Sequence, residues 1–386
     1  MESPSPALTP RKRILMAFDH QKADRIPVFD VANNPELFKE MIGMENPWSD
    51  GAPTVLLAKK LGLDAAMVPV RNYTALIPRP EFWTGPSSFK DRFGVGYTVS
   101  ETSWPLGMPT IEPALDREFL DVIRHAVITN DDFDPIEDAV RAGHTASFDE
   151  IAVFAGVRSA FSFLTVSAGL VGVSLLIYED PDLLHELVEA ATDYWTQVGL
   201  RAIELGVDAL YVANDMGMNG STLISPTHLR EFFLPAFARQ CTVWKKAGGR
   251  VILHSCGNIE AILPDLAAMG SHGLGGFDGL NNLQSHAGMN IASVKERYGR
   301  QWTLIGNVDA TTVMTSSRLE DIDEAILSVI QCAGDEGGLI LATDHSFHKG
   351  IPIENVLHFI ERAKTMGRYS SGLSDREKKT CMEGSV

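Results

Sequence analysis

The feature that most constrains this chain is a regular alternation of short apolar runs with longer amphipathic stretches. The stretches between the runs repeat apolar residues at three- and four-residue steps, as in residues 184–198, which predicts amphipathic helices. Strands that alternate with helices in this way form parallel sheets, and eight such units are typical of an α/β fold of the (β/α)₈ TIM-barrel type. The eight runs span residues 26–31, 64–70, 151–157, 207–213, 250–255, 276–282, 302–307 and 338–343.

The predicted barrel accounts for the whole chain as one domain, residues 1–386. The first ten residues and residues 372–386 are polar and aperiodic, so we expect frayed ends there. Residues 71–150, which follow the second run, do not fit a plain helical crossover because Pro, Gly and Trp recur through them. We expect an inserted subregion over the barrel mouth, where such insertions commonly shape a substrate pocket.

Composition excludes several classes of protein. The net charge of −17, from 50 acidic and 33 basic residues, would repel polyphosphate, so nucleic acid is not an expected partner. The amino terminus lacks the apolar core of a secretory signal, and we expect no run near the ~20 apolar residues that cross a bilayer. These expectations indicate a cytoplasmic protein. Four scattered cysteines do not make a disulfide framework.

Polar residues cluster where four of the predicted strands end. In a parallel barrel these ends share one face, and active sites form on that face. We therefore expect a functional site built from these clusters. They are Asn214 and Asp215 after the fourth run, His254 and Cys256 at the fifth, Asn307 and Asp309 at the seventh, and Asp344, His345 and His348 after the eighth.

His254 and Cys256 are the best candidates for metal ligands. One residue separates them, so strand alternation aims both side chains to the same side. An imidazole nitrogen and a sulfur that converge suit Zn²⁺ best. A catalytic zinc takes three protein ligands and keeps one position open, and we expect His345 to be the third. The alternative is a buried core cysteine beside a hydrogen-bonded histidine.

The remaining polar residues each allow a functional and a structural interpretation. Asp215 could orient substrate, transfer protons or bind the metal, or it could cap the glycine-rich loop that follows it. The same choice faces Asn307 and Asp309, and Asp309 could cap the next helix. His348 could instead be a solvated loop histidine. Arg71 and Tyr73 follow the second strand and are candidates for the pocket wall, while Cys241 and Cys332 lie in helical patterns typical of packing residues.

Five segments together resemble the uroporphyrinogen decarboxylase superfamily, over nearly the whole chain. The resemblance implies a distorted (β/α)₈ barrel, and it is much more specific for the superfamily than for one reaction. The segments are TPRKRILMAFDHQKADRIPV, ISPTHLREFFLP, GGRVILHSCGNIEAILPDLAAMG, LIGNVDATTVM and GGLILATDHSFHKGIPIENV.

Two branches of the superfamily are relevant. True decarboxylases carry an arginine-rich segment soon after the first strand, where this chain has VFDVANNPELF, which argues against a tetrapyrrole octa-carboxylate as substrate. The other branch resembles corrinoid-dependent methyltransferases, which bind zinc through an H-x-C pair and a cysteine after strand eight. His254 and Cys256 match the pair, and His345 replaces that cysteine.

The replacement predicts a particular reaction. One thiolate and two neutral imidazoles leave zinc with a formal charge of about +1, which suits polarisation of an ether oxygen. We therefore expect a methyltransferase that acts on a small O-methyl substrate. The chain lacks a corrinoid-binding module, so the corrinoid (cobalamin) must come from a partner protein. The resemblance also makes a homodimer possible.

Three alternatives stay open. The first is a methylcobalamin:thiol methyltransferase of the coenzyme M kind. The second is a metal-free decarboxylase-like lyase that uses Asp215 and His345. The third is a non-catalytic protein that binds a tetrapyrrole or corrinoid.

Overall fold

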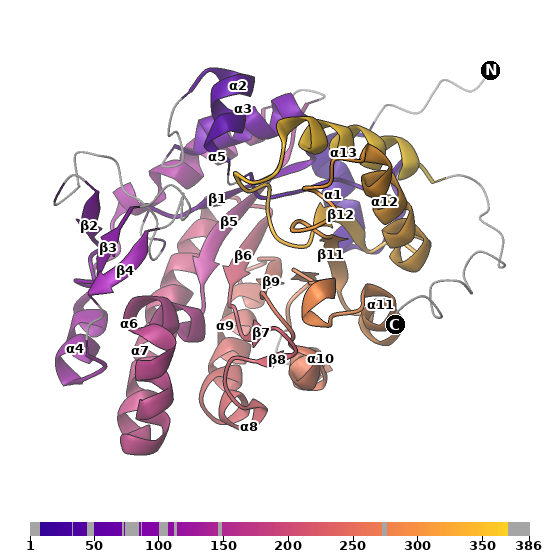
Figure 1. Cartoon of the computed structure of the whole chain (residues 1–386). Helices are drawn as coiled ribbons and strands as arrows, with labels where there is room; N and C mark the ends of the chain where they lie inside the picture. The colour runs from indigo at the N-terminus through magenta and orange to yellow at the C-terminus, as the bar shows by residue number, and fades with distance from the viewer. Residues whose placement is uncertain are drawn as a thin grey trace, which may run out of the picture.

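A computed structural model describes residues 8–32, 34–44, 50–71, 73, 85, 87–99, 107–111, 114–145, 149–271 and 276–369. Its main sheet has seven parallel strands that neighbour one another in chain order, and helices cover the outside (Figure 1). Each strand falls within or at one of the predicted runs, which confirms the α/β barrel class. The strands are β1 (Ala65–Pro69), β5 (Ala152–Arg158), β6 (Ala209–Ala213), β9 (Val251–His254), β10 (Gly279–Asn281), β11 (Thr303–Val308) and β12 (Leu339–Thr343).

The first predicted run, residues 26–31, differs from the expectation, because it forms one parallel bridge to β12 instead of a strand. Two carboxylates take the place of main-chain acceptors on either side of it. Asp64, just before β1, accepts the Val28 N–H at 2.8 Å, and Asp30 accepts the Thr343 N–H at 2.7 Å. The run therefore lies between the two edge strands, β12 and β1, and occupies the eighth position of the barrel without a regular ladder.

The helices form where the apolar periodicity predicted them. The helical pattern of residues 184–198 lies in one helix, as predicted, and further helices begin at Pro226 and after Pro352. They belong to a set of α1 (Pro10–Phe18), α2 (Pro35–Ile42), α3 (Gly51–Leu61), α4 (Arg117–His125), α5 (Asp134–Gly143), α6 (Ala160–Glu179), α7 (Pro181–Glu204), α8 (Pro226–His228), α9 (Leu234–Lys246), α10 (Leu263–Ser271), α11 (Ile291–Tyr298), α12 (Leu319–Ala333) and α13 (Ile353–Met366).

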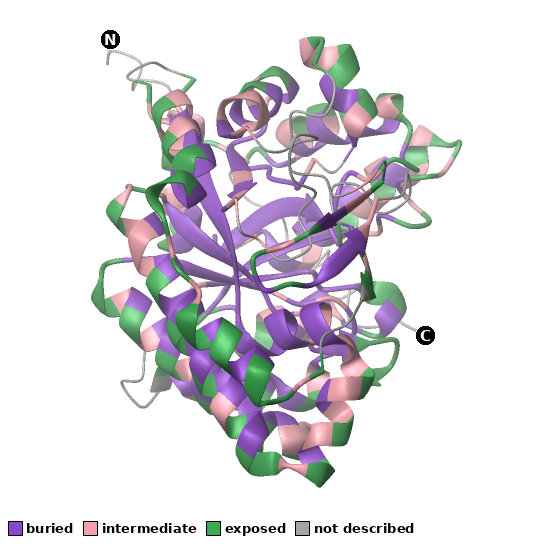
Figure 2. Ribbon diagram, turned by 90° about the vertical axis from the view of Figure 1, so that its left-hand side faces the viewer, coloured by how far each residue is buried: buried purple, intermediate pink, exposed green. Residues whose placement is uncertain are grey.

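Alternate residues of the strands fill the barrel interior, as a pleat with period two requires. Phe154, Tyr211, Ile252 and Ile340 are among these buried side chains. Helix α1 adds its own apolar face to the same cluster, and its Ala17 carbonyl accepts a hydrogen bond from Thr303 on β11. Figure 2 shows the result as buried strands inside a shell of helices with exposed outer faces.

A repeated Gly-x-Asp sequence precedes three of the strands and anchors each to its neighbour. It reads GLD at 62–64, GVD at 206–208 and GFD at 276–278. Each aspartate accepts a main-chain N–H from the neighbouring strand or run that comes before it in the chain. Asp64 accepts the Val28 N–H, Asp208 accepts the Val153 N–H, and Asp278 accepts the Val251 N–H. The carboxylates also pair with cations from other elements, namely Arg25 with Asp64, Arg11 with Asp208, and Lys245 with Asp278. These contacts tie together the strand starts, away from the face where the polar clusters lie.

The insertion after the second predicted strand contains a small antiparallel sheet of its own. Its strands are β2 (Ser88–Lys90), β3 (Gly96–Thr98) and β4 (Met108–Ile111), at one side of the barrel in Figure 1. Phe93, in the turn between β2 and β3, packs edge-on against Phe163 of α6 and Tyr194 of α7. The insertion is thus present and rests on the helices around β5. Residues 74–84 and 100–106 lie outside the described part, so its extent over the mouth stays a prediction.

The amino-terminal end differs slightly from the expectation of a frayed segment up to residue 10. Pro10 begins α1, and Thr9 caps this helix by accepting the Lys12 N–H.

One apolar segment also differs from the expectation. Helix α6 is long and apolar enough to cross a membrane by length and composition alone, although half of its most apolar stretch is buried within the structure. Its helical geometry is interrupted at Gly169, which has φ 77°. Cys381 lies outside the described residues, whereas Cys241 and Cys332 lie in α9 and α12 as predicted.

Candidate metal centre and active site

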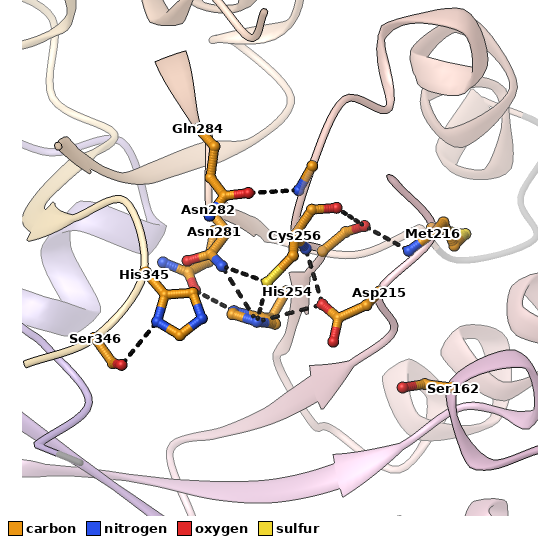
Figure 3. A network of polar contacts seen from close by, with 12 residues as sticks. Ser162, Asp215, Met216, His254, Cys256, Asn281, Asn282, Gln284, His345 and Ser346 are labelled. Carbon is orange, nitrogen blue, oxygen red and sulfur yellow. Dashed lines mark hydrogen bonds and ion pairs between the residues drawn. The ribbon is translucent and has the colours of Figure 1, made fainter. Parts of the chain in front are cut away.

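Three side chains with metal-binding atoms meet where β6 and β9 end. Their ligand atoms, from Asp215, His254 and Cys256, all lie within 4.8 Å of one another. The Cys256 Sγ is 3.7 Å from the His254 Nε2, and the Asp215 Oδ1 is 3.5 Å from the same nitrogen. Figure 3 shows the three side chains turned toward one point. The prediction that His254 and Cys256 converge is confirmed.

Hydrogen bonds at the Nδ1 of His254 turn its Nε2 toward the Cys256 sulfur and the Asp215 carboxylate. The Asn281 amide is oriented by its Nδ2, which donates to the Ile305 carbonyl at 3.1 Å. Its Oδ1 therefore faces the His254 Nδ1 at 2.7 Å, and Nδ1 must carry the proton. The Tyr211 hydroxyl also contacts Nδ1, at 2.5 Å. A histidine that donates from one nitrogen to an amide oxygen is the usual arrangement of a metal ligand bound through the other nitrogen.

Asn282 contacts the candidate ligand atoms of both His254 and Cys256. Its Nδ2 lies 3.2 Å from the Cys256 sulfur and 3.3 Å from the His254 Nε2. The residue is buried, with φ 68°, a left-handed conformation that asparagine tolerates better than most residues. An N–H aimed at sulfur stabilises the thiolate, which is the form that binds metals.

The loops after β6 and β9 are joined by hydrogen bonds that position Asp215 against Cys256. The Cys256 N–H donates to the Asp215 Oδ1 at 2.8 Å, the Gly217 N–H donates to the Cys256 carbonyl at 3.1 Å, and the Met216 N–H donates to Ser255 Oγ at 3.0 Å. The spacing of the ligand set is therefore fixed by the main chain of both loops.

The electrostatics of the group differ between its acidic members. Burial alone would raise the pKa of Asp215, but the neighbouring His254 and the Cys256 N–H outweigh it and keep that pKa below its usual value. Burial, followed by the Asp215 charge, raises the pKa of the Cys256 thiol well above its usual value. A bound cation would offset the cost of ionising this thiol, because metals bind the thiolate form.

The donor set fits zinc. Cysteine sulfur, histidine nitrogen and carboxylate oxygen are the ligand types that zinc takes in proteins, and three of them leave a position for substrate. The observation that supports this fit is the half-buried His254, whose Nδ1 faces an amide oxygen while its Nε2 lies beside the Cys256 sulfur and the Asp215 carboxylate.

His345 is not one of the three residues whose ligand atoms lie within 4.8 Å of one another, and its role as a metal ligand remains a prediction. The third member of the group is Asp215, and the His345 ring lies beside the group, its Nδ1 2.8 Å from Ser346 Oγ (Figure 3). Burial, followed by the charge of His254, lowers the pKa of His345 to about 4. This imidazole is therefore neutral near pH 7, and it lies close to the group of three ligand atoms without being one of them.

Two other predicted residues, Asp309 and Asp344, form a second group with His286. Their ligand atoms also lie within 4.8 Å of one another. His286 follows β10 in the short turn η5 (Ser285–Ala287), and the two aspartates follow β11 and β12. As expected for a cap, the Asp309 Oδ1 accepts the N–H groups of Thr311 and Thr312.

Four predicted substrate residues make structural contacts. The Asn307 Nδ2 donates to the Leu283 carbonyl at 3.0 Å. Both ring nitrogens of His348 contact the main chain, at the Ala310 carbonyl and the Gly350 N–H. Arg71 turns to Asp134 at the start of α5. Asn214 is buried, with its Nδ2 3.7 Å from the Met216 sulfur. Their roles in substrate binding remain predictions.

Tyr73 lies beside a buried cation, Arg158, that the sequence did not single out. The Arg158 guanidinium sits over the Tyr73 ring, 4.2 Å from its centroid, and donates to Ser162 Oγ at 3.1 Å. Arg158 is 3% exposed and contributes to the low pKa of Asp215. It is the last residue of β5, so its position at a strand's carboxyl end was a usable signal. Tyr211, Asn281, Asn282 and His286 were also missed, and only the two asparagines carried a signal, as polar residues in a strand-like run.

Comparisons with known proteins agree with this architecture. A family model described as uroporphyrinogen decarboxylase (URO-D) matches residues 91–366. A methylated-thiol–coenzyme M methyltransferase of Methanosarcina mazei is 24% identical over 197 residues, which are 51% of this chain and 48% of that protein. A uroporphyrinogen decarboxylase of Alkalilimnicola ehrlichii is 24% identical over 359 residues, 89% of this chain and 90% of that one.

The solved structures include one with the same fold, a methyltransferase from Methanosarcina mazei. It superposes with a TM-score of 0.69 at 18% identity, covering 93% of this chain and 99% of the other. In sequence, this chain spans about half the length of the first curated relatives that it matches. The family match covers well over half of the 386 residues. The resemblance found in the sequence is confirmed, and the chain belongs to the uroporphyrinogen decarboxylase (URO-D) family.

Proposed function

We propose that this chain is a methyltransferase that moves a methyl group between a small methylated substrate and the cobalt of a corrinoid carried by a partner protein. The observation that carries the proposal is the convergence of Asp215, His254 and Cys256 at the mouth of the barrel. The name of the Methanosarcina mazei relative supports it, since that protein transfers methyl groups of methylated thiols. The lyase alternative gives no reason for a sulfur ligand in such a group.

Asp215, His254 and Cys256 would hold a zinc ion, which when bound would supply a Lewis acid to the atom that carries the methyl group. The chain's own residues prepare the site for it. Asn281 holds His254 in the binding tautomer, and Asn282 donates to the Cys256 sulfur. Arg158 and Tyr73 form a wall beside Asp215.

The donor set favours sulfur over oxygen as the atom that carries the methyl group. The O-methyl expectation depended on two neutral imidazoles and one thiolate, which would leave a divalent ion at about +1 by formal counting. Asp215 in place of His345 adds a second anionic donor and brings the formal sum to zero. An electron-rich set of this kind keeps a substrate thiolate nucleophilic. A methylated thiol is therefore the first substrate class, and a methyl ether is the second.

The transfer itself moves CH₃ as a formal cation. When sulfur is the donor, the carbon–sulfur bond breaks, the sulfur keeps the electron pair as a thiolate, and the cobalt(I) pair forms the new bond to carbon. In the reverse direction a thiol substrate must lose its proton before it can attack. His345 lies beside the group, and this position is the reason that we assign it to accept that proton.

The test uses the full chain with zinc and reduced cobalamin, which stands in for the corrinoid protein. Methylation of cob(I)alamin is followed by absorbance with a panel of methylated thiols and a panel of methyl ethers. We expect transfer from the thiols, and loss of at least about 100-fold in rate for Cys256→Ser. Cys332→Ser, a cysteine substitution in α12, is the matched control and should keep the rate.

Other outcomes would replace the proposal. Transfer from ethers alone would restore the O-methyl substrate. Decarboxylation of a porphyrinogen carboxylate by wild type and Cys256→Ser alike, without methyl transfer, would establish the metal-free lyase.

A further inference from the structure

A second group of metal-binding atoms lies at the same end of the barrel, built from three different strand ends. The His286 Nδ1 is 3.7 Å from the Asp309 Oδ2 and 3.6 Å from the Asp344 Oδ2. These separations are too long for hydrogen bonds between the three groups. Atoms bound to one ion at ~2.1 Å lie roughly 3.0–3.5 Å apart. The spacing is therefore within a few tenths of an ångström of that around a shared cation.

Each carboxylate presents one oxygen to this point and uses the other to hold the main chain. The Asp309 Oδ1 accepts the Thr311 N–H at 2.8 Å, and the Asp344 Oδ1 accepts the Ala310 N–H at 2.9 Å. The two Oδ2 atoms are left facing His286. The side chains are thus oriented by the loops after β11 and β12 before any ligand arrives.

The Asp344 Oδ2 is the independent observation that points to a ligand. The Asp344 side chain is 0% exposed, and this oxygen has no hydrogen-bond partner among the described residues. A buried carboxylate oxygen without a partner is costly, and a second carboxylate, Asp309, lies within reach of the same point. A divalent cation would satisfy both oxygens and the imidazole at once.

We propose that His286, Asp309 and Asp344 form a second divalent-cation site, separate from the one that contains Cys256. One nitrogen and two carboxylate oxygens make a harder donor set than one with a thiolate, so this site favours Mn²⁺ or a similar ion, whereas the Cys256 site favours Zn²⁺. The proposal does not depend on the methyltransferase function, because its test measures binding alone.

The experiment is a titration of the full chain with Mn²⁺, after one equivalent of Zn²⁺ has been added. Free Mn²⁺ is measured by its electron paramagnetic resonance signal, which is lost on binding. We expect one Mn²⁺ per chain in wild type, and also in Cys256→Ser when that variant is titrated without added Zn²⁺. Asp344→Asn and His286→Ala should each weaken binding at least tenfold.

Two features keep the test decisive if one variant folds poorly. Asp344→Asn retains the oxygen that accepts the Ala310 N–H, and His286 is partly exposed, so its truncation leaves little to collapse. His358→Ala is the matched control, since His358 pairs with Asp323 at 2.9 Å on the outside of the barrel, where Arg362 already neutralises the carboxylate. Absence of a bound Mn²⁺ in wild type, or retention in both site variants, would overturn the proposal and leave an ordinary histidine–aspartate ion pair.

Discussion

Gly217 and Gly257 approach one another so closely that neither position has room for a side chain. A Cβ on Gly217 would lie 2.6 Å from main-chain atoms of residues 256–258, and a Cβ on Gly257 would lie 2.3 Å from the Gly217 carbonyl carbon. The two loops that carry Asp215 and Cys256 are therefore in direct main-chain contact. The distance between these two candidate ligands depends on that contact.

Gly217→Ala should weaken zinc binding although Gly217 is no ligand. The added methyl group must push the loops apart and move Asp215 away from Cys256, so we expect a loss of about tenfold or more in affinity. The measurement is competition for Zn²⁺ with a chromophoric chelator. Gly172→Ala is the control, because a Cβ there meets only Leu115 at 3.6 Å, an ordinary contact. Unchanged affinity in Gly217→Ala would show that the loop contact does not set the ligand spacing.

Asp215→Asn and His345→Ala distinguish the two candidates for the third zinc ligand. Since the Asp215 Oδ1 lies within the ligand group and His345 lies outside it, we expect Asp215→Asn to lose about 100-fold or more in zinc affinity. His345→Ala should lose less than about threefold. Zinc content after dialysis and chelator competition measure both. The reverse order of the two effects would return His345 to the ligand set.

Asn281→Leu should weaken zinc binding through the tautomer of His254. Without the amide oxygen at 2.7 Å, Nδ1 no longer has this acceptor for its proton, and Nε2 is no longer held as the free nitrogen. Loss of such a supporting contact costs about 10–100-fold in metal affinity. Asn281→Asp keeps an acceptor oxygen at the same position and should restore most of the binding, a rescue not expected if Asn281 only fills space.

Asp208→Asn should lower stability in a pH-dependent way. Burial alone would raise the pKa of Asp208, but hydrogen bonds from His144, from the Val153 N–H and from Arg11 hold it below its usual value. Because the folded state lowers this pKa, the carboxylate stabilises the fold above the unfolded pKa of about 4, and this stabilisation is lost as the pH falls below it.

We expect the Asp208→Asn variant to lose about 2 kcal/mol in free energy of unfolding at pH 7. The gap to wild type should narrow at pH 3, as urea denaturation at both pH values would measure. Glu150→Gln, at the other, more exposed partner of Arg11, should change stability much less. An equal difference in free energy of unfolding between variant and wild type at both pH values would contradict the proposed link between the Asp208 pKa and stability.

The strands of the barrel could be predicted from sequence because their signal is local. Buried parallel strands are continuous apolar runs, and seven of the eight runs became strands. The first run failed because its ladder depends on Asp30 and Asp64, one of which lies outside the run and becomes an acceptor only once the barrel has closed. No local pattern in residues 26–31 carries that information.

The site was predictable in part for the same reason. His254 and Cys256 are close in sequence, so alternation alone brings them together. The third member had to be chosen between Asp215 and His345, which follow separate strands, and the contact of Gly217 with Gly257, which brings the Asp215 loop against the Cys256 loop, leaves no local pattern in the sequence. Asn281 and Asn282 belong to the sixth run, and only the folded barrel brings their amides to the neighbouring His254 and Cys256.

The Gly-x-Asp anchors and the reactive side chains stand at opposite ends of the same strands. Asp208 directly precedes β6, and Asp215 follows the end of that strand; Asp278 directly precedes β10, which ends at Asn281. Each of these strands is thus hydrogen-bonded to its neighbour at its start, so a substitution of a side chain at its carboxyl end leaves the contacts that hold the barrel together unchanged. A chain built this way can change its chemistry by single substitutions at one rim while the opposite rim preserves the architecture.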